Sequence, residues 1–544
     1  FLSMGKDGPS PTHIYAEYFI LRPLFILGLR DVSIVTAYAI GNFVGVFFLI
    51  VAIYFFVLRL AGNKWLAAAT ALFVIGGYTF FTQYPIRVSP FTDQINIYGR
   101  PLMPYFASLF FFLFLNFLLQ SLDRSEKRYV WYSGLLFGAL FYTYPYAWTF
   151  SMALLFTLGC AYGLQRNRTQ LKKVVSIAMV GLVIGSPILV RISRIAQTQL
   201  GQQINYFSGI LYDHSPAPFS KVVGVSLLLW LVFSMLHKDH PRRYIILCLL
   251  ASGIIAMNQQ ILTGRIVQFL HYFWYFVIPL AIIADLSMFW IIFRALLPRS
   301  LQVIIFFTLL VLVYSNTIFR QYLAYFDTKS VKLYAQNYGP IIDILNEDKQ
   351  PKTILSSDIF FGNIFSVYTN HDMYWSADAY ATNTPLDRIK DAFFVYLRLN
   401  RLARRNTLEF LKNERNGRSN IFDAYHQSSI TTDQSSKIFY HLESFLSGSS
   451  DAAEYSLLIA NHDPGLLAKQ EEVDRLLLEE YKINTKTEAD FLSLLRRGNI
   501  AYIVWDKNLN PNWDLSVVPC LSLVKGFHNV FLYTVDWKNP VCAL

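Results

Sequence analysis

Ten apolar runs, each near the length of a membrane-spanning helix, restrict the fold of this chain more than any other sequence feature. A spanning helix needs about 20 mostly apolar residues. The fourth and fifth runs are short and flank Pro145, so they form either a tight helical hairpin or one kinked element. The sequence therefore predicts a polytopic α-helical membrane protein with about ten spans. The runs are 34–58, 65–83, 103–120, 129–143, 147–164, 174–191, 221–236, 244–258, 270–293 and 301–318.

Charged residues separate the chain into two parts. Residues 1–316 contain 32 of the 83 charged residues, and residues 317–544 contain the other 51. The first share is too low for a soluble protein, whereas the second is ordinary for a globular domain. The net charge of +11 belongs to the apolar part, because the second part carries 24 basic and 27 acidic residues. We therefore expect contact with membrane lipid and no nucleic-acid partner.

Basic residues in the short connecting loops predict the orientation. One alternating set of loops contains fourteen Lys and Arg residues, and the other contains six in loops that are longer overall. The segment before the first run adds three to the smaller set and leaves the majority unchanged. Cytoplasmic loops are enriched in Lys and Arg, so the larger set is predicted to be cytoplasmic. Residues 1–33, the loops 84–102 and 192–220, the 258–268 segment and the C-terminal domain then lie outside.

Residues 320–544 are predicted to form a soluble extracytoplasmic α/β domain after a juxtamembrane helix near 320–348, because strand-like and helix-like segments alternate. The expected strands are 353–357, 455–460, 500–505 and 530–535, and the expected helices are 385–403, 466–482 and 487–497. The stretch 413–452 is rich in Ser, Asn, Asp and Gly and is expected to be a long loop. Cys520 and Cys542 could form a disulfide if this domain faces an oxidising compartment.

Cys160 and Cys248 lie in apolar runs and are interpreted as packing residues. No CxxC motif or Cys/His metal spacing is present in the sequence. We therefore predict no required cofactor and no metal ligands, and the pattern leaves the use of a divalent metal open.

The outer segment 1–33 contains the first candidate site. Asp7 and His13 lie in a Gly- and Pro-rich stretch, and Glu17 follows His13 by four residues. The run Ile14–Leu29 is amphipathic enough to lie along the membrane surface. A carboxylate at this boundary can act as a general base on an incoming hydroxyl. The simpler interpretation is a solvated loop that caps a helix.

The loop Tyr84–Pro101 contains the second candidate site. Arg87 and Arg100 lie on the predicted outer side, against the general trend, and Asp93 lies between them. A guanidinium group matches the oxygens of a phosphate, so phosphate binding would explain their position. Pairing with Asp93 or with lipid headgroups would explain it equally well.

A polar cluster interrupts the apolar sequence at another predicted outer boundary. It includes Gln260 and Arg265, followed by Gln268 and His271. Arg265, Gln268 and His271 are spaced to share a helical face. Polar groups at membrane depth line a cavity or pair with one another, so the cluster is either a substrate site or an interhelical hydrogen-bond network. A lone His with amides is a weak ligand set, and no metal is implied here.

An aromatic set surrounds Pro145 and consists of Tyr142, Tyr144, Tyr146 and Trp148. Aromatic residues collect at membrane interfaces, so an interfacial belt is the simplest interpretation. The sharper hypothesis is that Tyr144 and Trp148 stack on a sugar ring or line a groove for a polyprenyl chain.

Over residues 5–320 the chain resembles the GT-C superfamily of integral-membrane glycosyltransferases, in particular the protein-mannosyltransferase and aminoarabinose-transferase branch. The resemblance rests on many spans with short basic inner loops, the outer acidic segment at the start, and the outer loop with Arg87 and Arg100-Pro101. The Ile34–Leu60 run followed by Ala61-Gly62-Asn63-Lys64 and a second apolar run is also typical. A C-terminal outer domain is common in that superfamily.

The resemblance implies a sugar donor on a polyprenyl or dolichyl phosphate and an inverting displacement at the anomeric carbon. Asp7 would deprotonate the acceptor, His13 would match the His that often follows in that loop, and Arg100 or Arg265 would bind the lipid phosphate. The sequence departs from the pattern in three ways. No span precedes Asp7, so we expect an upstream segment; no second acidic residue adjoins Asp7; and the Trp-Trp-Asp-Tyr-Gly motif of oligosaccharyltransferases is missing.

The predicted function is therefore a hexosyltransferase of the plasma membrane. It would move a sugar from a dolichyl or undecaprenyl phosphate to a lipid, glycan or protein acceptor on the outer face. The alternative is a non-catalytic protein of envelope polysaccharide export or assembly, or a polysaccharide polymerase or ligase. A transporter often shows internal pseudo-symmetry, which this sequence lacks, and a polymerase or ligase would need a large outer loop with basic and His residues. The largest loop between runs, 192–220, has few of them.

Overall fold

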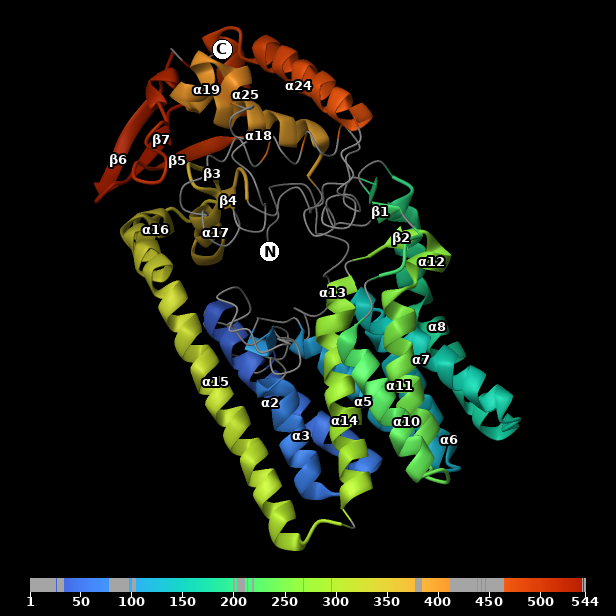
Figure 1. Cartoon of the computed structure of the whole chain (residues 1–544). Coiled ribbons are helices and arrows are strands. Elements are labelled where there is room, and N and C mark those ends of the chain that lie inside the picture. Colours follow the sequence, from blue (N-terminus) through green and yellow to red (C-terminus); the bar gives the residue numbers. More distant parts are fainter. Residues whose placement is uncertain are drawn as a thin grey trace. The chain divides into compact units, whose positions relative to one another are not determined.

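The computed structural model is mainly helical, with a small mixed sheet in the C-terminal region (Figure 1). Each of the ten predicted apolar runs contains a helix within its described residues. The structure describes residues 26, 34–77, 97–99, 104–198, 201–202, 211–212, 214–217, 220–267, 269–294, 296–376, 384–410, 438, 442, 446, 464–540 and 542. The ten helices are α2 (Ile34–Ala61), α3 (Lys64–Gly76), α5 (Tyr105–Asp123), α6 (Lys127–Leu140), α7 (Pro145–Leu164), α8 (Arg168–Ala196), α10 (Lys221–Leu236), α11 (Arg243–Met257), α14 (Ile278–Phe293) and α15 (Arg299–Ala335).

Among the described residues, six helices are long and apolar enough to cross a membrane by length and composition. These stretches are Val35–Ala61, Tyr105–Asp123, Pro145–Leu164, Arg168–Ala196, Phe273–Phe293 and Arg299–Phe326. The helices α3, α10 and α11 are apolar but shorter. Helix α15 exposes large apolar side chains, including Phe307 at 67%, Val311 at 56% and Tyr314 at 68%. Such a surface is costly in water and suits a hydrocarbon environment, in agreement with a helical membrane protein.

Local signals explain where several helices begin. Helix α2 ends at a turn in which Gly62 has φ +71°, a left-handed conformation that a residue without Cβ adopts readily. The side chain of Asn63 then accepts hydrogen bonds from the N–H groups of Trp65 and Leu66 and caps α3. Pro145 occupies the first turn of α7, where its missing N–H costs nothing. The fourth and fifth apolar runs are therefore two helices, α6 and α7, joined by a short turn rather than one kinked element.

Helices α2 and α5 pack side by side in parallel. A Cβ on Gly45 would lie 2.1 Å from the Tyr105 ring near the start of α5, so the backbones approach closely there. Fourteen residues further along α2, Arg59 donates a hydrogen bond to Asn116 of α5 at 2.9 Å. Both contacts shift toward higher residue numbers on α2 and on α5 together, so the two helices run in the same direction. The chain must therefore reverse between them, and α3 runs in the return direction.

Helices α6 and α8 also pack in parallel, through two small-residue motifs. Gly134 and Gly138 of α6 lie against Val180 and Ile184, and Gly181 and Gly185 of α8 lie against Phe137 and Phe141. Each pair of glycines is spaced by four residues, which places both on one helix face and lets the backbones approach closely. This is a recurrent way for apolar helices to associate in a membrane, where burial of apolar surface supplies no driving force.

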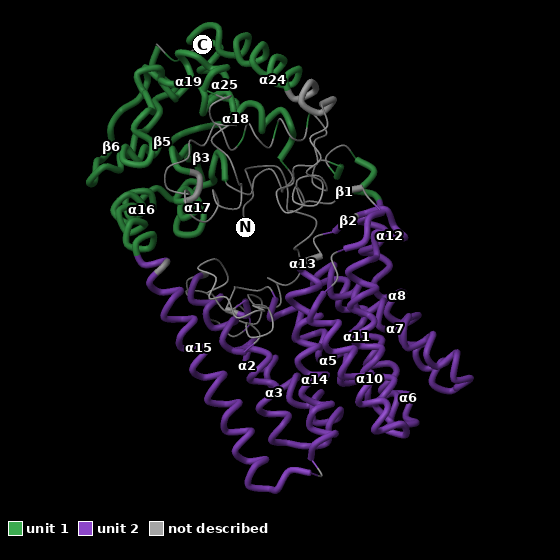
Figure 2. Tube along the Cα trace, in the orientation of Figure 1, with its two compact units in different colours: residues 1–10, 194–211, 330–544 green, residues 11–193, 212–329 purple. Residues whose placement is uncertain are grey.

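The chain divides into two compact units, the helical unit of residues 11–193 and 212–329 and the C-terminal unit of residues 1–10, 194–211 and 330–544 (Figure 2). The expected boundary at residue 320 falls inside α15, which continues without a break to Ala335. The reason is local, because no Pro or Gly interrupts residues 320–335, so the helix persists after the apolar run ends.

The C-terminal sheet has the strand order β4-β3-β5-β7-β6. Its first three strands pair in parallel, whereas β7 pairs antiparallel with both β5 and β6. The strands expected near 353, 500 and 530 are confirmed, the one at 455–460 lies outside the described residues, and β4 and β6 were not anticipated. The strands are β3 (Thr353–Ser356), β4 (Asp372–Met373), β5 (Ile500–Asp506), β6 (Leu521–Phe527) and β7 (Val530–Val535).

Apolar side chains cover both faces of this sheet, because strand residues alternate between them. Leu355 and Ile503 pack with residues of α18 (Leu386–Leu399) and α25 (Glu488–Arg497). Ile354 and Val504 pack on the other face with residues of α16 (Gly339–Glu347) and α17 (Ile359–Tyr368).

The expected helix at 385–403 is instead two helices, α18 and α19 (Arg401–Arg405), because the side chain of Asn400 caps a new start. The helices expected at 466–482 and 487–497 are confirmed as α24 (Pro464–Asn484) and α25. Thr487 and Asp490 form a capping box at the start of α25. Cys520 and Cys542 form a disulfide, as the sequence allowed.

Candidate functional site

All six site residues predicted in the segments 1–33 and 84–101 lie outside the part of the chain that the structure describes, as does one residue from the polar cluster. These are Asp7, His13, Glu17, Arg87, Asp93, Arg100 and Gln268. The remaining predicted residues, Tyr144, Trp148, Gln260, Arg265 and His271, are all described and all belong to the helical unit. They come from two segments that are more than 100 residues apart in the sequence.

The structure brings Tyr144 and His271 together. Tyr144 precedes α7 in an extended conformation, with φ −158° and ψ 128°, and its side chain is buried. His271 lies on the single-turn helix α13 (Phe269–Tyr272), which packs against α7 and α11. The Tyr144 hydroxyl and the Nδ1 atom of His271 are 2.6 Å apart, a short hydrogen bond.

Further aromatic rings surround this hydrogen bond. Tyr146 meets His271 edge to face at 4.8 Å between ring centroids, and Tyr275 stacks on His271 at 5.4 Å. The Tyr272 hydroxyl is 2.7 Å from Thr149 Oγ1 on α7. We call these six residues, Tyr144, Tyr146, Thr149, His271, Tyr272 and Tyr275, the Tyr144–His271 cluster.

A segment of π-helix begins two residues after His271. Phe273–Val277 forms the π-helical segment η2, which then continues as α14. A π-helical turn adds a residue to the regular α-helical register and is often found at functional sites. Tyr272, just before this segment, contacts Thr149, and Tyr275 within the segment stacks on His271.

The cluster combines polar groups that can exchange hydrogen bonds or protons with aromatic rings that surround them. An imidazole can donate, accept and transfer protons near neutral pH. If the Tyr144 hydroxyl donates to Nδ1, the neutral ring carries its proton on Nε2; if it accepts, the proton is on Nδ1. His271 and Tyr146 are only half-buried, so part of each ring remains accessible. Of the four tyrosines, Tyr146 is the one with an accessible face, which suits the apolar face of a sugar or an isoprenoid chain, whereas the other three are buried.

The polar cluster around Gln260 is largely a hydrogen-bond network. Gln260 is 4% exposed and donates to the carbonyl of Ser215 at 3.1 Å. Asn258 Oδ1 accepts from the Ala217 N–H at 2.9 Å, and His214 Nδ1 lies 3.0 Å from the Ile261 carbonyl. These bonds fasten the turn around 258–264 to residues 214–217, which is the structural alternative that the sequence left open.

The prediction that Arg265, Gln268 and His271 share a helical face is wrong for Arg265. Helix α12 (Gln260–Thr263) ends at Gly264, whose φ of +65° stops the helix. Arg265 then lies in the short strand β2 (Arg265–Ile266), which pairs with β1 (Leu211–Tyr212). The next helix begins only at Phe269, so Arg265 and His271 belong to different elements.

Trp148 has a different environment from Tyr144. Its ring stacks on Phe141 at 4.5 Å between centroids, with an interplanar angle of 12°. It therefore helps to hold the turn between α6 and α7 together. Among the described residues, no group of three His, Cys, Asp or Glu side chains could hold a metal ion.

Two polar contacts between apolar helices were not anticipated from the sequence. Asp285 of α14 accepts a hydrogen bond from Ser226 of α10 at 2.9 Å, and Arg59 of α2 binds Asn116 of α5. Asp285 lies inside an apolar run and Arg59 directly follows one, so both are visible in the sequence, whereas their partners are not.

Comparison with known proteins adds no assignment, because no protein-family model and no curated protein matches this chain.

Proposed function

We propose that this chain is an integral-membrane glycosyltransferase that moves a sugar from a polyprenyl-phosphate donor to an acceptor on the outer face of the membrane. The observation that carries the proposal is the convergence of Tyr144 and Tyr146 with His271 beside a π-helical turn. Aromatic faces can bind both the sugar and the isoprenoid chain of such a donor. The imidazole supplies a hydrogen-bond donor or a proton carrier next to them.

The proposal includes ten spans, with the N-terminal segment and the C-terminal unit on the outer side. Two parallel helix pairs, α2 with α5 and α6 with α8, support the alternation that this topology requires. The disulfide Cys520–Cys542 supports an extracytoplasmic C-terminal unit, because disulfides persist in oxidising compartments. In this topology the Tyr144–His271 cluster lies near the outer boundary.

In the proposed reaction the acceptor oxygen forms a bond to the anomeric carbon while the bond from that carbon to the phosphate oxygen breaks. Asp7 takes the acceptor proton, and polyprenyl phosphate leaves. Arg100 or Arg265 binds the phosphate, as the family resemblance implies. His271 donates a hydrogen bond to the phosphate oxygen on which charge grows, and Tyr144 fixes the orientation of its ring. Stabilising charge as it develops is the most effective use of such a donor.

The test is transfer activity of the full chain in proteoliposomes with a panel of polyprenyl-phosphate-linked hexoses. The readout is the release of polyprenyl phosphate. We expect His271→Ala to lower turnover at least about 100-fold, in the range of a lost acid–base or charge-stabilising group. Tyr144→Phe should lower it less and should shift the pH profile, because it changes the partner of the imidazole.

Tyr142→Phe is the matched control. Tyr142 is two residues away, and its hydroxyl donates to the Ile184 carbonyl rather than to the cluster. The turnover of Tyr142→Phe should stay within about threefold of the wild-type turnover, since the hydrogen bond that this variant loses lies outside the cluster. The proposal fails if the wild type turns over no donor of the panel, or if His271→Ala keeps the wild-type rate. Loss of activity in Asp7→Asn with intact thermal unfolding would separately support Asp7 as the base.

A further inference from the structure

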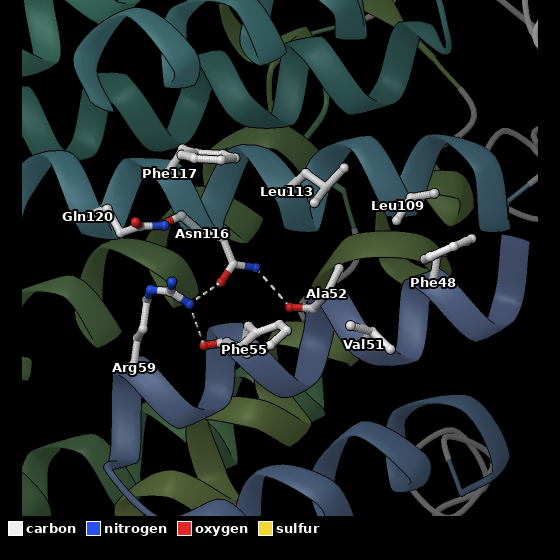
Figure 3. A pocket seen from close by; sticks show the side chains of 10 residues that line it. All are labelled: Phe48, Val51, Ala52, Phe55, Arg59, Leu109, Leu113, Asn116, Phe117 and Gln120. Atoms are coloured by element: carbon white, nitrogen blue, oxygen red, sulfur yellow. Dashed lines mark hydrogen bonds between the residues drawn. The ribbon is translucent and has the colours of Figure 1, made fainter. Parts of the chain in front are cut away.

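A groove runs between helices α2 and α5 and has a volume of about 360 Å³. Its walls are almost entirely apolar, with Phe48 and Val51 on α2 and Leu109 and Leu113 on α5. Figure 3 shows that the lining residues of the two helices follow the same order, from Phe48 and Leu109 at one end to Arg59 and Gln120 at the other. The groove is thus apolar along its length and cationic at one end.

Arg59 is held in place at that end by a fixed set of hydrogen bonds. Its Nη1 atom donates to the Phe55 carbonyl at 3.2 Å and to Asn116 Oδ1 at 2.9 Å. Asn116 is 5% exposed, and its Nδ2 atom donates to the carbonyls of Ala52 and Phe112, both at 2.8 Å (Figure 3). Because both amide hydrogens are engaged, the Asn116 oxygen must face Arg59 and fixes the guanidinium.

The opposite edge of the Arg59 guanidinium retains its hydrogen-bonding capacity. Within the described residues, neither Nε nor Nη2 has a hydrogen-bond partner, and no carboxylate lies within 4.0 Å of Arg59. Asp123, the acidic residue at the end of α5, is engaged by Arg242 through two bonds of 2.7 Å. The Nε–Nη2 edge is the one that forms bidentate pairs with a phosphate or carboxylate.

The dimensions of the groove match one leaflet of a bilayer. From Phe48 to Arg59 an α-helix rises about 16 Å, at 1.5 Å per residue. Half of the hydrocarbon core of a typical bilayer is about 15 Å thick. Phe48 and Phe55 are 52% and 45% exposed, so the groove opens on an apolar surface rather than into the helical core. Arg59 also lies at the end of α2 where the sequence predicts the cytoplasmic leaflet.

We infer that this groove binds one anionic phospholipid of that leaflet, with an acyl chain between α2 and α5 and the headgroup phosphate on Arg59. The charge of the headgroup complements Arg59, the one cation among the described residues that line the groove. The inference goes beyond the glycosyltransferase proposal and does not depend on it. It requires only that α2 and α5 lie in a membrane.

The test uses the purified full chain in nanodiscs of zwitterionic phosphatidylcholine. Phosphatidylglycerol is added, thermal unfolding is followed, and native mass spectrometry counts retained lipid. We expect phosphatidylglycerol to raise the midpoint of the wild type and to remain bound. Arg59→Gln should weaken its apparent affinity by roughly tenfold or more, the effect of losing a charge-assisted phosphate contact. Val51→Phe should do the same by filling the apolar part without changing the charge.

Lys64→Gln is the matched control, since Lys64 lies at the same end of α2 and α3 but contacts the Trp65 ring outside the groove. It should retain the wild-type response. Retained binding in both Arg59→Gln and Val51→Phe would overturn the inference, as would equal loss in Lys64→Gln, which would indicate diffuse surface attraction. An equal response to inorganic phosphate would exclude a lipid as the occupant. If Arg59→Gln fails to fold, the lipid binding of Arg59→Lys and Val51→Phe is compared with that of the wild type in its place.

Discussion

Asp506 offers a quantitative test of how the C-terminal unit is held together. It is fully buried at the end of β5, and among the described residues no Lys, Arg or His forms an ion pair with it. Its carboxylate instead accepts hydrogen bonds from the hydroxyls of Tyr334 and Tyr338 at 2.7 to 2.8 Å and from the N–H groups of Asn508 and Leu509. A buried charge without a cation depends entirely on such donors.

The perturbation is Tyr338→Phe, which removes one donor and keeps the ring. Tyr338 is fully buried, so water cannot replace its hydroxyl. A hydrogen bond to a charged group contributes roughly 1.5–3 kcal/mol, so we expect about 2 kcal/mol of lost unfolding free energy. That corresponds to a decrease of about 4–8 °C in the midpoint for a unit of this size. Tyr334→Phe should cost about 1 kcal/mol, because water can reach the half-buried Tyr334 and replace part of the bond.

Alkaline pH gives a second, independent readout. Burial raises the pKa of Tyr338 well above its usual range, and the nearby carboxylate of Asp506 raises it further. A raised pKa stabilises the folded state fully below about pH 10, the pKa of an unfolded tyrosine. Above that pH the unfolded chain releases a proton that the folded chain retains, so stability decreases. The wild type should therefore lose stability more steeply above pH 10 than Tyr338→Phe.

The assay is pulse proteolysis in urea on the full chain in detergent micelles, read with an antibody against a C-terminal tag. A double-mutant cycle with Asp506→Asn should show a coupling of about 1–2 kcal/mol between the two groups. The reasoning would be refuted if Tyr338→Phe stayed within about 0.5 kcal/mol of the wild type. It would also be refuted if Tyr334→Phe were the more costly change, or if the alkaline slopes of wild type and Tyr338→Phe coincided.

Two further predictions concern packing and the covalent link. Gly181→Ala should lower the thermal stability of the helical unit by about 1–3 kcal/mol through overpacking, whereas Gly163→Ala, where a Cβ meets nothing within 4 Å, should be neutral or slightly stabilising; equal effects in a thermal unfolding assay would contradict the close α6–α8 contact. Removing the Cys520–Cys542 disulfide, which spans 22 residues, should cost about 3 kcal/mol by loop-closure entropy. Cys520→Ser should therefore unfold like the wild type treated with reductant, and an unchanged midpoint in both would count against a structural disulfide.

The sequence predicted the helical elements well and their ends less well. Long apolar runs indicate helices because a helix is the structure that satisfies its own backbone hydrogen bonds in a membrane. Hydropathy gives no information on where a helix ends once its side chains become polar. Helix α15 continues to Ala335 past the end of its apolar run for this reason. Strand β6 was missed because most of its side chains are exposed, so it lacks the apolar alternation of a half-buried strand.

The sequence indicated Tyr144 and His271 as separate candidates, but it did not predict that they lie in contact. Tyr144 and His271 each stood out as polar or aromatic residues beside an apolar run, and 127 positions separate them. No periodicity links residues on different helices, so their hydrogen bond depends on how α7 and α13 pack. The π-helical segment also has no sequence signal here, because residues 273–277 read simply as part of an apolar run. Arg265 was placed on a helix in the prediction because Gly264 was not recognised as the residue that ends α12.

Two neighbouring tyrosines show why the Tyr144–His271 pair is the better candidate for chemistry. The Tyr142 hydroxyl donates to the Ile184 carbonyl at 2.8 Å, and a backbone carbonyl inside a helix cannot turn to meet a ligand. The Tyr144 hydroxyl instead faces an imidazole, which can exchange donor and acceptor roles as its protonation changes. A polar contact between two side chains, of which His271 is only half-buried, next to an irregular helical turn is therefore where a substrate can replace a protein partner at the smallest structural cost.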